Sequence, residues 1–185
     1  MGNGKEEIRI IARNAKRLQQ LTENILSVTR IESRTLKLNK EKFDIDLALS
    51  IAIRDSRSQV ENKNVELIHK PVSEELYVEA DRDRITQVIS NLLHNAIKFT
   101  KEGIILISSE RDNNNVVVSI EDNGTGIDSQ IFPLLFSKFA TKSDKGTGLG
   151  LYICKNIIEA HGGEIFAENN YGKNGATFSF SLPAV

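Results

Sequence analysis

The sequence has one cysteine, three prolines and no tryptophan among its 185 residues. A single cysteine excludes a disulfide within the chain and a zinc site built from cysteine pairs. No apolar run approaches the roughly 20 residues that a membrane-spanning helix needs, and the N-terminus lacks the apolar segment of a signal peptide. We therefore expect these residues to be cytoplasmic and without membrane contact, whether or not a full-length protein carries a membrane anchor elsewhere.

A strong charge of either sign is also missing. The chain has 24 basic and 25 acidic residues, which gives a formal net charge of −1. This balance produces no field that would attract nucleic acid or an anionic membrane, so we expect neither as a partner. The chain does have 39% hydrophobic residues, enough to bury the core of one ordinary domain with an appendage.

The N-terminal appendage is predicted to be one long amphipathic helix, because Lys5 to about Leu38 contains no proline and no glycine. Its apolar residues recur with helical spacing, at Ile8, Ile11, Ala15, Leu18, Leu21, Ile25 and Val28. Several lie seven residues apart, as in a helix bundle or coiled coil. A helix of about 50 Å outreaches so small a domain. We therefore favour a homodimer through residues 8–30 over packing of this helix on its own domain.

The remaining chain is predicted to be an α+β domain. Apolar patterns predict three helices, one from Leu47 to about Glu61, one that begins after Asp81 and one from about Leu149 to Ala160. Short β-branched runs predict strands at 65–69, 76–80, 104–110, 116–121, 164–168 and 176–182. Because the strands are mostly linked as hairpins, we expect a two-layer α/β sandwich with the helices on one face.

A polar stripe is predicted on the second of these helices. Asn91, Asn95 and Lys98 are spaced so that they project from one side, whereas Leu92 and Leu93 lie on the other. An asparagine oxygen can help to hold Mg²⁺ between substrate phosphates without adding charge. The alternative is a face that is simply solvated.

A carboxylate and two glycines follow the fourth predicted strand. Asp122 ends this strand, and Gly124 and Gly126 come directly after it. The carboxylate can accept a hydrogen bond from an exocyclic amine, while the glycine backbone lets a flat ring approach. An aspartate that merely begins a turn would give the same sequence.

The segment before the last predicted helix combines aromatic residues, lysines and glycines. The aromatic residues and lysines are Phe132, Phe136, Phe139, Lys138, Lys142 and Lys145. They predict either a flap with apolar anchors and cations or a short amphipathic helix with solvated lysines. Gly146, Gly148 and Gly150 follow, and they suit either a phosphate site at a helix start or a plain turn.

Four of these segments together resemble the N, G1, F and G2 boxes of sensor histidine kinases, in the family's order. They are Asn91–Thr100, Asp122–Ile127, Phe136–Phe139 and Gly146–Leu151. The resemblance implies that residues 41–185 form a catalytic ATP-binding domain with the Bergerat fold, an α/β sandwich. It also implies that residues 1–40 are the second helix of the family's dimerisation and phosphotransfer hairpin, with the first helix absent.

The resemblance further implies a role for each polar residue. Asp122 would bind the adenine amine, Asn95 would hold Mg²⁺, Asn91 would assist through water, and Lys98 would lie near the phosphates. Residues from Phe136 to Gly146 would form a lid over ATP. The other implied nucleotide-binding residues are Gly124, Gly126, Ile127, Phe136, Phe139, Lys142, Lys145, Gly146, Thr147, Gly148, Leu149, Gly150 and Thr177.

The family's phosphoacceptor is a histidine followed by an acid and then a proline, and this motif is absent. None of His69, His94 and His161 has that context. We therefore expect this chain to be the catalytic portion of a protein-histidine kinase. It would present the γ-phosphate of ATP to a histidine on a helix outside this chain, for onward signalling to a response regulator. Autophosphorylation of this chain alone is not expected.

Two other functions stay open: an ATP-binding regulatory module that transfers no phosphate, and an ATPase of the topoisomerase or chaperone type. In the topoisomerase relatives, a glutamate that activates water matches Asn91. An amide cannot accept a proton at neutral pH. The resemblance therefore predicts slow ATP hydrolysis.

Overall fold

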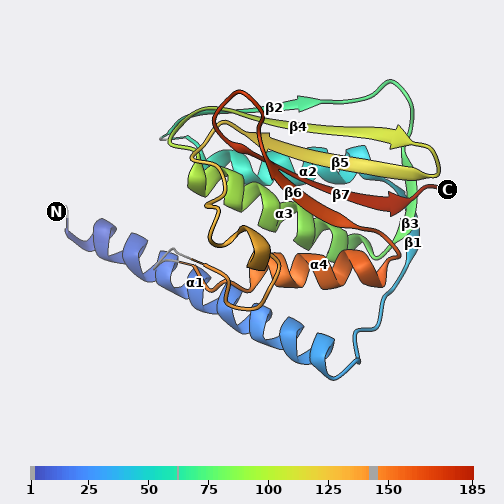
Figure 1. Ribbon diagram of the computed structural model, residues 1–185. Helices are drawn as coiled ribbons and strands as arrows, with labels where there is room; N and C mark the ends of the chain where they lie inside the picture. The colour runs from blue at the N-terminus through green and yellow to red at the C-terminus, as the bar shows by residue number, and fades with distance from the viewer. Residues whose placement is uncertain (1–2, 62, 142–145) are drawn as a thin grey trace.

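The computed structural model describes residues 3–61, 63–141 and 146–185 (Figure 1). Its centre is a five-stranded sheet with the strand order β2-β4-β5-β7-β6. These strands are, in that order, Asn64–Lys70, Glu102–Asp112, Asn115–Asp122, Ala176–Pro183 and Ile165–Asn169. Strands β2 and β4 are parallel, and the other neighbouring pairs are antiparallel. Strands β1 (Glu41–Asp44) and β3 (Tyr77–Ala80) form a separate two-stranded sheet.

Helices cover one face of the large sheet (Figure 1). They are α2 (Ile45–Ser56), α3 (Arg82–Phe99) and α4 (Gly150–Ala160). Two short 3-10 turns, η1 (Arg57–Gln59) and η2 (Phe132–Leu134), lie in the connections. The predicted two-layer α/β sandwich is therefore confirmed. None of the described helices combines the length and the apolar character that crossing a membrane requires.

The alternation of the central strands explains where the core lies. In β5, Val116, Val118 and Ile120 are buried against the helix layer, whereas the residues between them are only partly buried. Successive side chains of a strand point to opposite faces. Asp122 has the same parity as these three residues, so its carboxyl group also points to the helix side of the sheet.

Helix α1 (Asn3–Glu32) is shorter than predicted, because it ends at Glu32 rather than near Leu38. Arg34 has a left-handed backbone conformation with φ 53°. The Thr35 N–H donates to the Arg30 carbonyl at 2.9 Å and the Arg34 N–H to the Ile31 carbonyl at 3.1 Å. These two bonds are the Schellman arrangement that ends a helix. The sequence has no proline or glycine at this position that would predict it.

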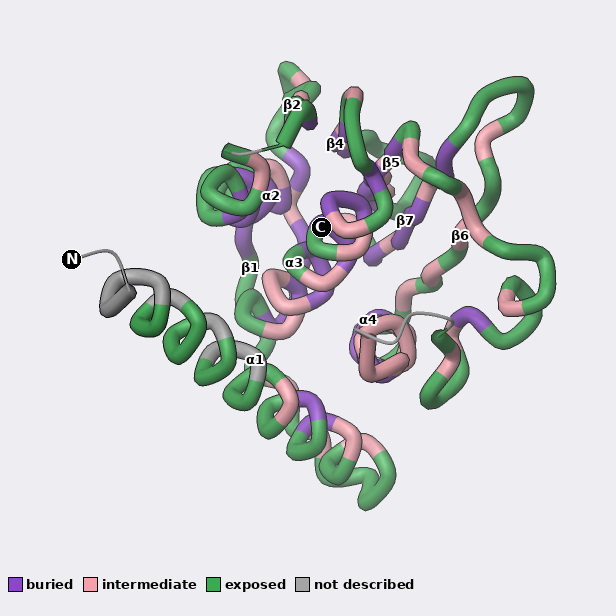
Figure 2. The backbone as a smooth tube through the Cα atoms, turned by 90° about the vertical axis from the view of Figure 1, so that its left-hand side faces the viewer, coloured by how far each residue is buried: buried purple, intermediate pink, exposed green. Residues whose placement is uncertain are grey.

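Helix α1 packs on its own domain along its C-terminal half (Figure 2). Asn24 and Ser27 are buried there, and Glu32 forms an ion pair with Lys138. Ile11 and Leu18 of the predicted seam are nevertheless 66% exposed. The domain therefore covers part of the predicted apolar stripe, because Leu21 lines the cavity and Val28 packs against the core. Ile11, Leu18 and Ile25 stay exposed.

Candidate functional site

One cavity of about 400 Å³ lies between α3, α1, the turn after β5 and the beginning of α4. It brings together ten of the residues predicted for the site: Asn91, Asn95, Lys98, Asp122, Gly126, Ile127, Gly146, Thr147, Gly148 and Gly150. These residues come from three separate stretches of the sequence. The fold thus assembles the polar helix, the carboxylate turn and the glycine segment around one space.

Asp122 forms the deep end of the cavity and is 4% exposed. Its Oδ1 accepts a hydrogen bond from the Gly124 N–H at 2.8 Å. Burial raises the pKa of the Asp122 carboxyl, and backbone N–H groups of Gly124 and Ala176 offset part of that shift. A buried carboxylate with a perturbed pKa in a cavity is a typical ligand-binding group, and this one is suited to a donor such as an amine.

Helix α3 supplies the polar wall. Asn91, Asn95 and Lys98 line the cavity, whereas Leu92 and Leu93 on the opposite side are buried in the core. The Nδ2 atom of Asn91 is buried and has no hydrogen-bond partner among the described residues. This atom is closed to solvent, so it faces the interior beside Cys154 and not the open space of the cavity.

A fully buried cysteine lies behind this wall. Burial raises the pKa of the Cys154 thiol to about 12, and the nearby Asn91 side chain offsets only part of that shift. Thiol chemistry needs the thiolate, so Cys154 is a neutral packing group.

The glycine segment forms the wall next to α4. Gly148 has φ +66°, and a Cβ there would lie 2.5 Å from the Phe139 carbonyl carbon. Its carbonyl accepts the Phe139 N–H at 3.0 Å, which ties both ends of the loop together. The first turn of α4, with Gly150 and Leu151, lines the cavity and has no side-chain cap. The start of a helix favours anionic groups.

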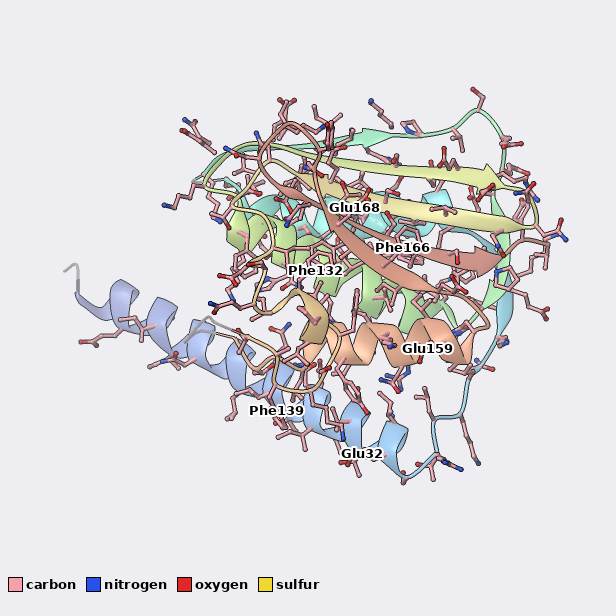
Figure 3. The ribbon with its side chains drawn as sticks, viewed as in Figure 1. Glu32, Phe132, Phe139, Glu159, Phe166 and Glu168 are labelled. Carbon is pink, nitrogen blue, oxygen red and sulfur yellow. The ribbon has the colours of Figure 1, made fainter. Side chains whose placement is uncertain are left out.

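Several predicted residues lie next to the cavity without lining it. Gly124 holds the Asp122 carboxylate through its N–H, and Leu149 is buried in the core at 6% exposure. Phe136 packs partly buried against the core. Phe139 is 70% exposed on the loop (Figure 3). These residues therefore shape the walls and do not face the space itself.

Thr177 lies on the other face of the sheet from the cavity. The cavity is lined by its neighbours Ala176 and Phe178, which alternate with it along β7. The Thr177 hydroxyl donates to the Asn170 Oδ1 at 2.7 Å. Lys142 and Lys145, which the sequence suggests as lid cations, lie outside the described residues.

Some lining residues were missed by sequence reasoning. The unexpected ones are Gln20, Leu21 and Asn24 of α1, with Ile131, Leu135, Ala140, Ala176 and Phe178 from the domain. Strand alternation offered a signal for Ala176 and Phe178. No local pattern connects α1 with this cavity, because the contact arises from how the helix folds back.

The described residues contain no cluster of three histidine, cysteine or carboxylate side chains that could hold a metal by themselves. A Mg²⁺ ion here would therefore need oxygens from a bound phosphate. Mg²⁺ usually takes only one or two protein oxygens in such sites and keeps several waters. Asn95 lines the cavity and can supply one such oxygen, with Asn91 one helical turn away on the same wall.

A family model described as "Histidine kinase-, DNA gyrase B-, and HSP90-like ATPase" matches residues 80–185. Sensor protein SrrB of Staphylococcus aureus (strain MRSA252) is 34% identical to this chain, over 97% of the chain and 32% of the length of SrrB. The chain thus spans about a third of this relative.

Two solved structures share the fold. The catalytic domain of histidine kinase ThkA is 37% identical with a TM-score of 0.72, over 78% of this chain and 95% of that domain. A structure of ThkA in complex with response regulator protein TrrA is 33% identical with a TM-score of 0.77, over 100% of this chain and 52% of that one. The chain therefore belongs to the histidine kinase-, DNA gyrase B- and HSP90-like ATPases, as an ATP-binding catalytic domain of the sensor histidine kinase type.

Proposed function

We propose that this protein binds ATP with Mg²⁺ and presents the γ-phosphoryl group to a histidine on another helix. The observation that carries the proposal is a single cavity that joins a buried carboxylate, an amide pair on α3 and an uncapped helix start. Each of these groups complements a different part of a nucleoside triphosphate.

The carboxylate end suits the adenine ring. Asp122 can accept a hydrogen bond from the exocyclic amine, and the backbone at Gly126 lets the ring come close. Ile127 and Phe178 line the same end with apolar surface. Guanine has a carbonyl oxygen where adenine has the amine, so an ionised Asp122 favours adenine.

The phosphate end combines α3 with the glycine segment. Asn95 would hold Mg²⁺, which neutralises phosphate charge when bound, and Asn91 would assist through water. Lys98 lies on the same wall, with its Nζ 4.9 Å from the centroid of the Phe99 ring. Phosphoryl transfer depends on position and charge stabilisation, and these residues supply both.

Asn91 also bears on the competing fate of ATP, which is hydrolysis. Its amide cannot take a proton from water at neutral pH, so it positions water or metal without creating a nucleophile. This property favours transfer to an acceptor over an ATPase cycle.

The acceptor histidine is proposed to come from another helix. His161 is buried with both ring nitrogens hydrogen-bonded. The His69 Nε2 lies 3.0 Å from Asp46 Oδ1. His94 lines the cavity from α3, with its Nδ1 3.1 Å from Gln59 Oε1. The rings of His161 and His69 are thus held by their neighbours, whereas His94 is exposed and lacks the sequence context of an acceptor.

Two macromolecular partners follow from this function. The ThkA complex with a response regulator supports such a protein as the final phosphate acceptor. The exposed residues Ile11, Leu18 and Ile25 of α1 support a homodimer through residues 8–30, because an apolar stripe of heptad spacing is the usual surface of a helix bundle.

The test measures nucleotide binding with and without Mg²⁺ and then transfer to a separately made histidine-containing acceptor hairpin. We expect Mg²⁺-dependent ATP binding that Asn95→Ala abolishes, followed by acid-labile phosphate on the hairpin. Asn114→Ala, in the exposed β4–β5 turn, is the matched control. Binding without transfer would favour a regulatory module, brisk hydrolysis would favour an ATPase, and label retained on this chain alone would point to His94.

A further inference from the structure

Two consecutive asparagines at the end of β6 hold the turn that carries Asp122. The Asn169 side chain accepts the Ile127 N–H at 2.6 Å and donates to the Ile127 carbonyl at 3.0 Å. One amide group thus satisfies both backbone groups of a residue that lines the cavity. A side chain needs one donor and one acceptor for this, which an aspartate or an alanine cannot supply.

Asn170 holds the other end of the same turn. Its Nδ2 donates to the Asp122 carbonyl at 2.8 Å, and its Oδ1 accepts the Thr177 hydroxyl at 2.7 Å. Asn170 also pairs through its backbone N–H with the Gly175 carbonyl at 3.0 Å. Thr177 is therefore linked to the cavity through Asn170 and the Asp122 backbone.

The backbone of the β6–β7 hairpin comes unusually close to the turn. Gly175 has φ +106°, and a Cβ on it would lie 1.9 Å from the Asp122 carbonyl oxygen. Lys173 of the same hairpin forms an ion pair with Glu121. Side-chain amides, one ion pair and a glycine contact thus join the hairpin to the residues from Glu121 to Ile127.

We propose that Asn169 and Asn170 are positioning residues for purine recognition, with Thr177 acting on Asn170. They fix the Asp122 carboxylate and the Ile127 backbone relative to each other, so that the base end of the cavity matches adenine. This inference rests on the proposed ATP-binding function. It assigns the role to a hairpin whose asparagines do not themselves line the cavity.

The main test is Asn169→Asp, which keeps the acceptor for the Ile127 N–H and turns the donor toward the Ile127 carbonyl into a second acceptor. We expect ATP affinity to fall about 2- to 10-fold, the effect of losing one solvent-accessible hydrogen bond and of placing a carboxylate oxygen against the Ile127 carbonyl. We expect GTP affinity to change little, because the phosphate contacts come from α3 and α4. The ratio of the two affinities should therefore shrink. Glu168→Gln, on the same strand with an exposed side chain (Figure 3), is the matched control.

A second pair of variants keeps the test valid if Asn169→Asp does not fold. Thr177→Val removes the hydroxyl donated to Asn170 without changing the size of the side chain, and Thr177→Ser restores the hydroxyl. We expect Thr177→Val to lower the ratio of ATP affinity to GTP affinity and Thr177→Ser to return this ratio to the wild-type value. Thermal melting checks that each variant is folded.

The measurement on the wild-type protein distinguishes a failure of the proposed function from a failure of the positioning role. Wild-type protein that binds no ATP would overturn the proposed function and this inference with it. Wild-type binding with an unchanged ATP-to-GTP ratio in folded Asn169→Asp, or an equal loss for both nucleotides, would overturn the positioning role alone.

Discussion

Replacing Leu18 by lysine is expected to abolish self-association through α1. Leu18 is 66% exposed, as is Ile11, and Ile25 one heptad further on is 58% exposed. Fully burying a leucine is worth about 1.5–3 kcal/mol, so about 1–2 kcal/mol of that remains to be gained at Leu18. A symmetric pair contains the residue twice, which makes the loss about 2–4 kcal/mol. This corresponds to a dissociation constant about 30- to 1,000-fold weaker.

Sedimentation equilibrium over a range of protein concentrations measures this change directly. Phe166→Lys is the control, because Phe166 is a similarly exposed apolar residue (48%) on β6, away from α1 (Figure 3). We expect wild type and the control to dimerise alike and Leu18→Lys to sediment as a monomer. A wild-type protein that stays monomeric at every concentration would refute the reasoning, as would a Leu18→Lys dimer of unchanged strength.

Two further predictions concern stability. In urea titrations, Gly148→Ala should lower the free energy of unfolding by more than Gly172→Ala. Both glycines have φ near +70°, where an alanine is strained by about 1–2 kcal/mol, but only at Gly148 would the added Cβ also meet Phe139. Equal losses would argue against the Phe139 contact. Burial lowers the pKa of His161, so as pH falls below about 6.5 the unfolded chain takes up a proton at this residue before the folded chain does, and stability decreases. Urea midpoints should drop from pH 7.5 to 5.5, and His161→Gln should reduce that drop, whereas an unchanged slope would exclude His161 as the cause.

The parts of the site that could be predicted depend on short-range spacing. Asn91 and Asn95 are four residues apart, so any regular helix places them on one side together. Asp122 follows three apolar residues of the same strand parity, which puts its carboxylate on the core side. Helical and strand periods are fixed by backbone geometry, and they need no knowledge of the tertiary fold.

Other parts depend on contacts that leave no periodic trace. Gln20 and Asn24 reach the cavity because α1 folds back on the domain, and the α3 residues that line the same cavity lie about seventy positions later in the chain. The heptad spacing of Leu18 and Ile25 indicates that they share a face. This spacing does not reveal that an adjacent face of the same helix packs against the domain. Arg34 ends α1 with a left-handed conformation that arginine rarely adopts. The C-terminal end of α1 could therefore not be predicted from the sequence either.

The place of β7 in the sheet has a consequence during synthesis. This strand lies between β5 and β6, yet it follows both in the sequence. Until the ribosome has released Ala176–Pro183, β5 has an unpaired edge, and β6 lacks the strand with which it pairs. An open edge is a template for pairing with other chains. A nascent chain that stalls in the β6–β7 hairpin would therefore carry the α3 asparagines but no closed base end, and it would be a target for chaperones rather than a partly active enzyme.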